Sequence, residues 1–246
     1  MNKKQSDVFA HRGSSSRCPE NTLAAFRAAL ADGADGIELD VQLTADGQVA
    51  VIHDHTLERT TEGTGLVREQ TLSMIRQYSA GAWFGSSFST ERVPSLQEVL
   101  EWIRPTSLRL NIELKCPAWD RDELALAVAR LVRQTGMSGQ VIYSSFDHLA
   151  MEMLARLDPQ TERAALIGGS LIDAEDYALG HKFKGLHLYY PMVDEKMAAR
   201  ILGRGLALRL YTVNDPQWLG YFMENGVTAV MTDEPGLAVK IRKDLA

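Results

Sequence analysis

The chain is poor in cysteine and has no long apolar run. Its 246 residues include only two cysteines, Cys18 and Cys116. Two cysteines so far apart do not make a disulfide framework, which is typical of a reduced, cytoplasmic protein. No apolar run approaches the ~20 residues of a membrane span, and the opening sequence MNKKQSDVFA lacks the apolar core of a signal peptide. We therefore expect a cytoplasmic protein without a membrane segment.

Excess positive charge is also missing. The chain has 26 Lys and Arg against 32 Asp and Glu, a net charge of −6. No basic patch stands out, which argues against a nucleic-acid partner, and the acidic balance disfavours stable association with anionic membranes. An anionic small-molecule substrate would have to be attracted by a few local cations. The sequence leaves the oligomeric state open.

Apolar strand-like runs alternate with helical patterns along the chain. This alternation favours β/α units around a parallel sheet, and the 45% hydrophobic content suits one large core. The predicted strands are residues 8–10, 36–41, 109–114, 141–145, 163–167, 185–188, 207–212 and 228–232. The predicted helices include residues 22–31, 96–103, 121–134, 148–157, 195–202, 216–224 and 235–243. Eight strands with intervening helices predict an α/β fold, a (β/α)₈ TIM barrel, as a single domain over residues 1–246.

One further strand-like run, residues 48–53, interrupts the alternation. It follows residues 36–44 after the turn sequence ADG at 45–47, and an Asp-Gly pair between apolar runs is a strong hairpin signal. We expect an antiparallel β-hairpin beyond the barrel rim. The returning strand would carry His53 back to the mouth, near Asp40.

The segment of about 54–93 is too long for a plain loop between a strand and a helix. It is rich in Gly, Ser, Thr and Arg, with one short helical stretch at 72–78. The sequence therefore predicts a small insertion after the second barrel strand, over the carboxyl-terminal face where barrel enzymes keep their active sites. Trp83 in this insertion either lines a substrate pocket or anchors the insertion to the barrel.

Acidic side chains stand at the ends of two predicted strands. Residues two apart in a strand share a face, so Glu38 and Asp40 project together, and Glu113 shares a face with Lys115. On neighbouring strands about 4.8 Å apart, the three carboxylates would converge. Carboxylates that close either have raised pKa values or hold a cation between them, and ligation by oxygen alone favours Mg²⁺ or Ca²⁺. The alternative is that they pair with Arg or Lys side chains.

Several short motifs also occur in a distinctive order. They are AHRG at 10–13, PENT at 19–22, ELD at 38–40, HD at 53–54, IELK at 112–115, SSF at 144–146, YTVN at 211–214 and TD at 232–233. Together they resemble the glycerophosphodiester phosphodiesterase family over essentially the whole chain. The resemblance implies a phospholipase-C-like (β/α)₈ barrel, as in the cytoplasmic bacterial members. It also implies metal-dependent hydrolysis of a small glycerophosphodiester to glycerol 3-phosphate and an alcohol.

The resemblance assigns roles to individual residues. It implies a catalytic acid–base pair, His11 and His53; ligands of a divalent cation, Mg²⁺ or Ca²⁺, at Glu38, Asp40 and Glu113; and phosphate contacts at Arg12 and Lys115. Glu20 would support the site. Tyr211 stands where many members have Trp, on the substrate side, so the preferred alcohol stays open. We expect His11 as the base and His53 as the acid, although the sequence does not fix their order.

Other functions are compatible with parts of this pattern. The same scaffold could carry a lysophospholipase-D-like or phosphatidylinositol-phospholipase-C-like activity, but no amphipathic or basic segment provides access to lipid. A non-catalytic glycerophosphate-binding protein is a third reading, because fold alone does not fix function. Two histidines beside three carboxylates argue for catalysis.

Overall fold

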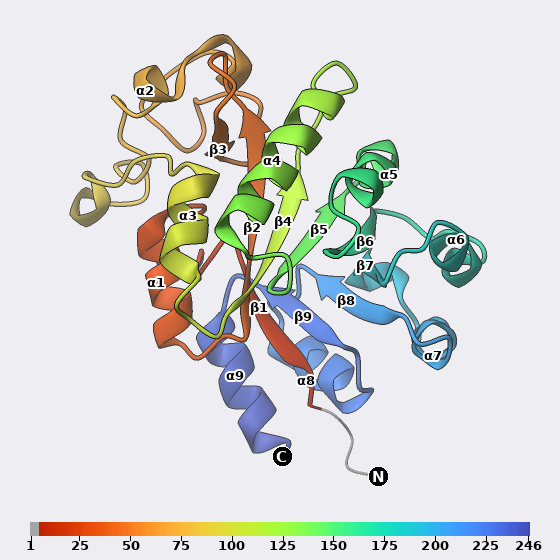
Figure 1. Ribbon diagram of the computed structural model, residues 1–246. Coiled ribbons are helices and arrows are strands. Elements are labelled where there is room, and N and C mark those ends of the chain that lie inside the picture. Colours follow the sequence, from red (N-terminus) through yellow and green to blue (C-terminus); the bar gives the residue numbers. More distant parts are fainter. Residues whose placement is uncertain (1–4) are drawn as a thin grey trace.

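The computed structural model describes residues 5–246, in which strands and helices alternate along the chain (Figure 1). The strands are β1 Asp7–His11, β2 Gly36–Leu43, β3 Val49–Val51, β4 Arg109–Leu114, β5 Val141–Ser145, β6 Glu162–Ile167, β7 Gly185–Tyr189, β8 Ala207–Tyr211 and β9 Ala229–Thr232. The α-helices are α1 Leu23–Ala31, α2 Leu72–Ile75, α3 Leu96–Ile103, α4 Arg121–Thr135, α5 His148–Leu157, α6 Ala174–Gly180, α7 Glu195–Gly203, α8 Pro216–Glu224 and α9 Pro235–Asp244. Short 3₁₀ turns are η1 Val67–Glu69, η2 Ser86–Phe88 and η3 Tyr190–Met192.

The sheet closes on itself into a barrel. Its strand order is β1-β9-β8-β7-β6-β5-β4-β2-β3, and an additional pairing of β1 with β2 completes the ring. β3 alone pairs antiparallel, with β2, and the pairings around the ring are parallel. The predicted (β/α)₈ barrel with a β-hairpin after the second strand is therefore confirmed.

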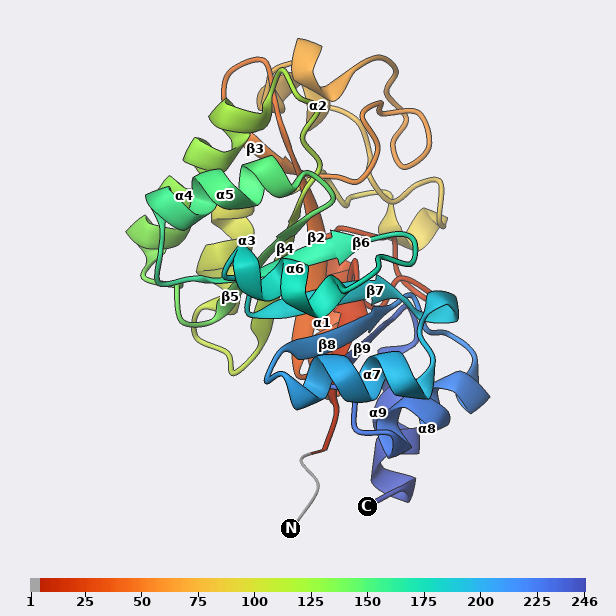
Figure 2. The same cartoon turned by 90° about the vertical axis from the view of Figure 1, so that its right-hand side faces the viewer.

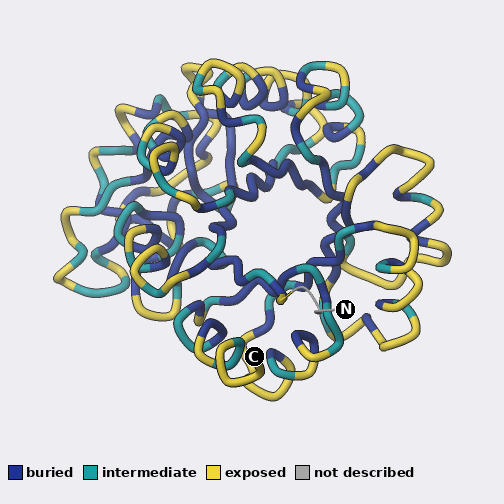
Figure 3. Tube along the Cα trace, turned by 60° about the horizontal axis from the view of Figure 1, so that its bottom comes forward, coloured by how far each residue is buried: buried dark blue, intermediate teal, exposed yellow. Residues whose placement is uncertain are grey.

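The main apolar core lies between the barrel strands and the surrounding helices. In β2, Ile37, Leu39 and Val41 are fully buried in this core. The alternate residues Glu38 and Asp40 belong to the other face of the strand, yet the whole strand is buried. Figure 3 looks into the barrel and shows a ring of buried strands inside a ring of helices exposed on their outer sides. Polar residues on the inner face are therefore held by a rigid wall.

Several helices begin where the sequence provides a capping side chain. Thr22, Asp147 and Asp215 accept hydrogen bonds from the first turns of α1, α5 and α8, and Ser95 forms a capping box with Glu98 at the start of α3. In β/α units these starts follow the strand ends, so the caps fix the loops that surround the barrel mouth. None of the helices within residues 5–246 is long and apolar enough to cross a membrane.

The segment between β3 and α3 forms a separate layer at one end of the barrel, opposite the end where α9 finishes (Figures 1 and 2). It carries η1, α2 and η2 and has its own buried apolar cluster, which includes Leu57, Val67 and Ile75. That the chain is a single domain remains our interpretation of this arrangement.

Two helices differ from the sequence-based expectation. The stretch 72–78 is helical only over Leu72–Ile75. Beyond it, the ring of Tyr78 packs where a side chain on Gly63 would lie. Helix α6 was not predicted. It starts after Asp173, which has a left-handed conformation and makes no side-chain capping bond, so the usual start signal is missing.

Candidate active site

Three carboxylates converge at the carboxyl-terminal end of the barrel. Glu38 and Asp40 come from β2 and Glu113 from β4, where Asp40 and Glu113 are register partners. One oxygen of each lies within 4.8 Å of the others, and all three residues are buried. The alternation of side chains along the two strands thus produces the convergence expected from the sequence.

Two cations lie against these carboxylates. Arg12 Nε is 3.2 Å from Asp40 Oδ2, and Lys115 Nζ is 3.2 Å from Asp40 Oδ1 and 2.5 Å from Glu113 Oε1. Burial opposes ionisation of Asp40, but Arg12 and Lys115 outweigh it and lower its pKa to about 2. Burial and the charge on Asp40 raise the pKa of Glu113 to about 7, and burial raises the pKa of Glu38 well above its ordinary value. Three ionised carboxylates would carry one negative charge more than Arg12 and Lys115 balance, and the raised pKa values of Glu38 and Glu113 reflect the cost of ionising all three in this buried site.

The carboxylate oxygens fit a divalent cation. Glu38 Oε1, Asp40 Oδ1 and Glu113 Oε1 are buried and have no hydrogen-bond partner among residues 5–246, although Lys115 stands at ion-pair distance from two of them. Buried oxygens without partners are costly unless a cation binds them. Three hard oxygen donors around one point are the ligands that Mg²⁺ and Ca²⁺ prefer.

His11 ends β1 beside this cluster. Its Nε2 is 4.0 Å from Glu38 Oε2, and its Nδ1 is 2.7 Å from Asp233 Oδ1. Asp233 also accepts hydrogen bonds from Asn214 Nδ2 at 2.6 Å and Ser15 Oγ at 2.9 Å. A carboxylate that holds Nδ1 orients the ring and leaves Nε2 to face the cluster. The sequence placed Asp233 only in the TD motif at 232–233 and gave it no role, so this contact was missed.

His53 has a comparable support from the insertion. Its Nδ1 is 2.6 Å from Asp54 Oδ1, and Arg59 donates to both oxygens of Asp54. Arg59 also donates to both oxygens of Glu20, which accepts a further hydrogen bond from Arg12 at 2.8 Å. This chain of contacts connects His53 to the cation beside Asp40 and gives Glu20 a supporting position. Arg59 was not singled out in the sequence.

The backbone around Arg12 requires glycine at one position. Arg12 has a left-handed φ of 57°, and its N–H donates to the Glu38 carbonyl at 2.9 Å. Gly13 follows with φ of 88°, and a side chain there would meet Ala25 of α1 at 2.6 Å. The AHRG motif thus turns the chain sharply at the strand end while letting α1 approach closely.

The remaining predicted residues lie in two different places. Tyr211 ends β8, with its ring 6.3 Å from Phe146 and its hydroxyl donating to the Ile167 carbonyl. Trp83 lies in the insertion, packs edge-on against Phe84 and donates to the Ala80 carbonyl. Both contacts of Trp83 lie within the insertion, and its side chain is 43% exposed, so they do not distinguish a pocket-lining role from anchoring to the barrel.

The other histidines have local partners away from the carboxylates. His187 is fully buried inside the barrel, with Nε2 3.3 Å from Arg209, and burial lowers its pKa well below the ordinary value. His148 contacts Tyr177, and His181 contacts Glu152. His55 binds Gln42 Oε1 through Nδ1.

Comparison with known proteins gives a consistent match. The model of the glycerophosphoryl diester phosphodiesterase family matches residues 11–237. The chain is 35% identical over 234 residues to a glycerophosphodiester phosphodiesterase of Caldanaerobacter subterraneus subsp. tengcongensis, covering 95% of this chain and 96% of the relative. A glycerophosphodiester phosphodiesterase of Bacillus altitudinis is 35% identical over 241 residues, covering 97% and 98%.

Solved structures of similar proteins have the same architecture. A phosphodiesterase from Oleispira antarctica, in complex with the product sn-glycerol-3-phosphate, superposes with a TM-score of 0.92 and 29% identity over 97% of each chain. A glycerophosphodiester phosphodiesterase from Agrobacterium tumefaciens gives a TM-score of 0.84 and 32% identity over 96% of this chain and 99% of the other.

Proposed function

The chain belongs to the glycerophosphoryl diester phosphodiesterase family, and from this premise we propose that His11 and His53 catalyse a metal-dependent cleavage of glycerophosphodiesters. The resemblance seen in the sequence motifs is confirmed, and the protein is an enzyme, a glycerophosphodiester phosphodiesterase. The proposed reaction adds water across the bond between phosphorus and the alcohol oxygen, giving glycerol 3-phosphate and the free alcohol. The single observation that carries the proposal is the position of His11 beside the carboxylate cluster.

The metal requirement is supported by the convergence of three buried carboxylates, of which Glu38 Oε1 has no partner among residues 5–246 and the other two oxygens, Asp40 Oδ1 and Glu113 Oε1, have only Lys115. Glu38, Asp40 and Glu113 would hold the ion, and their donor set suits Mg²⁺ or Ca²⁺ without choosing between them. When bound, a divalent cation supplies positive charge that stabilises the phosphoryl oxygens as negative charge develops on them.

The two histidines are suited to moving protons. Asp233 and Asp54 each hold the Nδ1 of one ring, so Nε2 remains to exchange a proton with substrate. We assign His11 as the base that activates the nucleophile and His53 as the acid that protonates the leaving oxygen. Burial lowers the pKa of His53, which makes its protonated form a stronger proton donor.

Arg12 and Lys115 are proposed to bind the phosphate. Both side chains are largely buried, with exposed fractions of 17% and 16%, and both reach the edge of the carboxylate cluster. A guanidinium can contact two phosphate oxygens at once, while an ammonium acts as a compact point charge. Asp40 pairs with both Arg12 and Lys115, and Glu113 pairs with Lys115. These pairs hold both cations beside the proposed metal site, where they could bind the phosphate of the substrate.

The substrate is proposed to be a small molecule. The Oleispira antarctica structure contains sn-glycerol-3-phosphate, the product expected from a glycerophosphodiester. A lysophospholipase-D-like or phosphatidylinositol-phospholipase-C-like activity would use the same groups on a lipid, so it remains the alternative. A purely glycerophosphate-binding role is not retained, because the family and its relatives are enzymes.

The acid–base assignment is tested by replacing each histidine. We expect His11→Ala and His53→Ala to lower kcat for a glycerophosphodiester by about 10²- to 10⁴-fold, the usual contribution of a general acid or base. Release of glycerol 3-phosphate measures the rate. His181→Ala is the matched control, because His181 is exposed and its ring lies against Glu152, Tyr177 and Phe183, away from the carboxylate cluster. Full activity in either site variant would contradict the assignment.

A further inference from the structure

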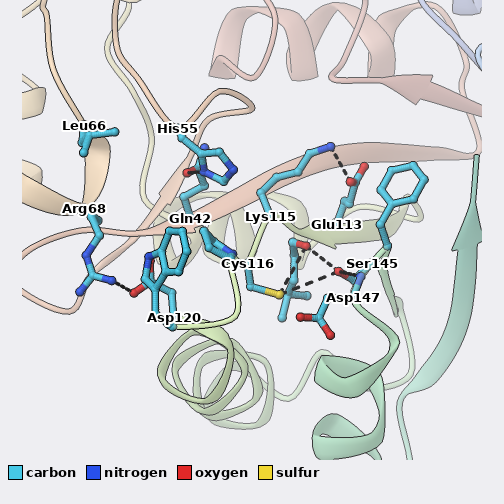
Figure 4. Close-up of a pocket in the computed structure, with 14 residues that line it drawn as sticks. Gln42, His55, Leu66, Arg68, Glu113, Lys115, Cys116, Asp120, Ser145 and Asp147 are labelled. Atoms are coloured by element: carbon cyan, nitrogen blue, oxygen red, sulfur yellow. Dashed lines mark hydrogen bonds and ion pairs between the residues drawn. The ribbon is translucent and has the colours of Figure 1, made fainter.

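A cavity of about 410 Å³ adjoins the carboxylate cluster between the ends of β4 and β5 and the insertion. Glu113 and Lys115 line it, so it reaches the reacting centre. Figure 4 shows the side chains of Glu113 and Lys115 directed toward one another at the edge of the cavity. Its hydrocarbon wall consists of Leu66, Leu114, Cys116, Pro117, Trp119 and Phe146. We call this space the apolar cavity.

The charged groups of the apolar cavity already have partners. Arg68 is ion-paired with Asp120 across the cavity wall, as Figure 4 also shows. Asp147 is ion-paired with Arg121 at 2.7 Å and also caps α5. These pairs leave little unsatisfied charge to bind the hydroxyl or amino groups of a ligand.

The uncharged polar groups of the same wall are engaged as well. Gln42 donates to the His53 carbonyl at 2.9 Å and accepts from His55. Ser145 donates to the Leu114 carbonyl at 2.7 Å. What the cavity offers beyond the cluster is therefore mainly hydrocarbon and aromatic surface, with Trp119 73% exposed and Phe146 51% exposed.

A second cavity, of about 400 Å³, lies on the side of His11 and has the opposite character. We call it the polar cavity. It is lined by Ser15, Glu20, Asn214 and Asp233, among others. These side chains already bond within the site, but their hydroxyl and carboxylate oxygens can each accept a further hydrogen bond. A glycerol arm with two free hydroxyls matches such a lining, because buried hydroxyls require hydrogen-bond partners.

We infer that the apolar cavity binds the leaving alcohol and makes the enzyme select alcohols that carry an alkyl chain. The inference rests on the proposed function, and it places the phosphodiester between the two cavities with one arm on each side. Lys115 Nζ lies 5.8 Å from the centre of the Phe146 ring, so the hydrocarbon wall begins next to the proposed phosphate position. Alcohols that carry further hydroxyl or amino groups would find no hydrogen-bond partners on this wall and would lose their hydrogen bonds to water.

The test compares two soluble esters of glycerol 3-phosphate, with ethanol and with hexanol as the alcohol, below any aggregation concentration. Burial of one methylene strengthens binding by at most about fourfold. The hexyl ester has four more methylenes than the ethyl ester, so even their partial burial is expected to raise kcat/KM by at least about tenfold. Equal efficiency on the two esters would overturn the inference alone. Hydrolysis of neither ester would overturn the proposed function and the inference with it.

Variants then locate the selectivity. Leu66→Ala and Trp119→Ala remove exposed parts of the wall, and each is expected to lower the hexyl-to-ethyl ratio of kcat/KM several-fold. Leu126→Ala is the matched control, because Leu126 is exposed on α4 and lines a separate pocket; its ratio should equal that of the wild type. A ratio that stays high in both wall variants would overturn the assignment to this cavity.

Discussion

At the scale of single residues, each of the two proposed catalytic histidines is paired with its own carboxylate. Asp54 follows His53 directly in the chain, so this pair is local, although no role for Asp54 was predicted from the sequence. Asp233 is 222 residues from His11, and the two meet only because β9 closes the barrel against β1. Alternation along two strands was enough to predict the cluster of Glu38, Asp40 and Glu113. No local pattern marks a contact that depends on the closure of the whole ring.

The pairing of Asp233 predicts a dependence of stability on pH. Burial opposes ionisation of Asp233, but hydrogen bonds from His11, Asn214 and Ser15 lower its pKa from 3.8 to about 2. The stabilisation is therefore present above the unfolded-state value of 3.8 and is lost as the pH falls toward 2. We expect the free energy of unfolding to fall more steeply over this range in the wild type than in Asp233→Asn. Urea unfolding at a series of pH values measures both, and parallel curves would contradict the prediction.

At the scale of elements, the insertion contributes to the site through Arg59. This side chain binds Asp54 and Glu20, and so connects His53 to the loop that follows β1. The sequence indicated where the insertion would lie, but not this contact. One arginine among many in a segment of irregular structure has no periodicity that would distinguish it.

Loss of Arg59 should impair catalysis more than folding. We expect Arg59→Ala to lower kcat by about 10- to 100-fold, because His53 would lose the group that fixes Asp54, and small displacements are costly in catalysis. Arg59→Lys should recover only part of the rate, since an ammonium cannot bind two carboxylates through a planar fork. Kinetics and thermal unfolding are measured side by side.

The control for Arg59 comes from the same insertion. Arg76 makes a similar, partly exposed ion pair with Glu98 at 2.9 Å, at the start of α3. Arg76→Ala should therefore leave kcat unchanged while causing a comparable small loss of stability. Equal losses of kcat in Arg59→Ala and Arg76→Ala would show that the effect is structural and not specific to His53.

At the scale of the whole molecule, the barrel could be predicted by counting strand-like runs. The count was right because residues 48–53 were assigned to a hairpin and not to the barrel wall. The barrel mouth divides into two halves that the count could not reveal. The loops after β1 and β3 supply the charged network of Arg12, Glu20 and Arg59. On the other half, the ring of Tyr211 lies within 6.3 Å of Phe146 and 6.1 Å of Tyr189. Such surfaces arise from loops of different strands, whose proximity only the closed barrel defines.

We propose that the three barrel carboxylates bind a divalent cation, on which the proposed reaction depends. Calorimetric titration of chelator-treated protein with Mg²⁺ and with Ca²⁺ tests it most directly, and the same samples are assayed for release of glycerol 3-phosphate. Glu113→Gln preserves the shape of a proposed ligand without its charge, and Glu152→Gln is the control at a partly exposed carboxylate outside the cluster. We predict saturable binding and recovery of activity with at least one of the two ions in the wild type and in Glu152→Gln, and weakened binding in Glu113→Gln. Full activity of the metal-free wild type, or unchanged binding in Glu113→Gln, would contradict the account.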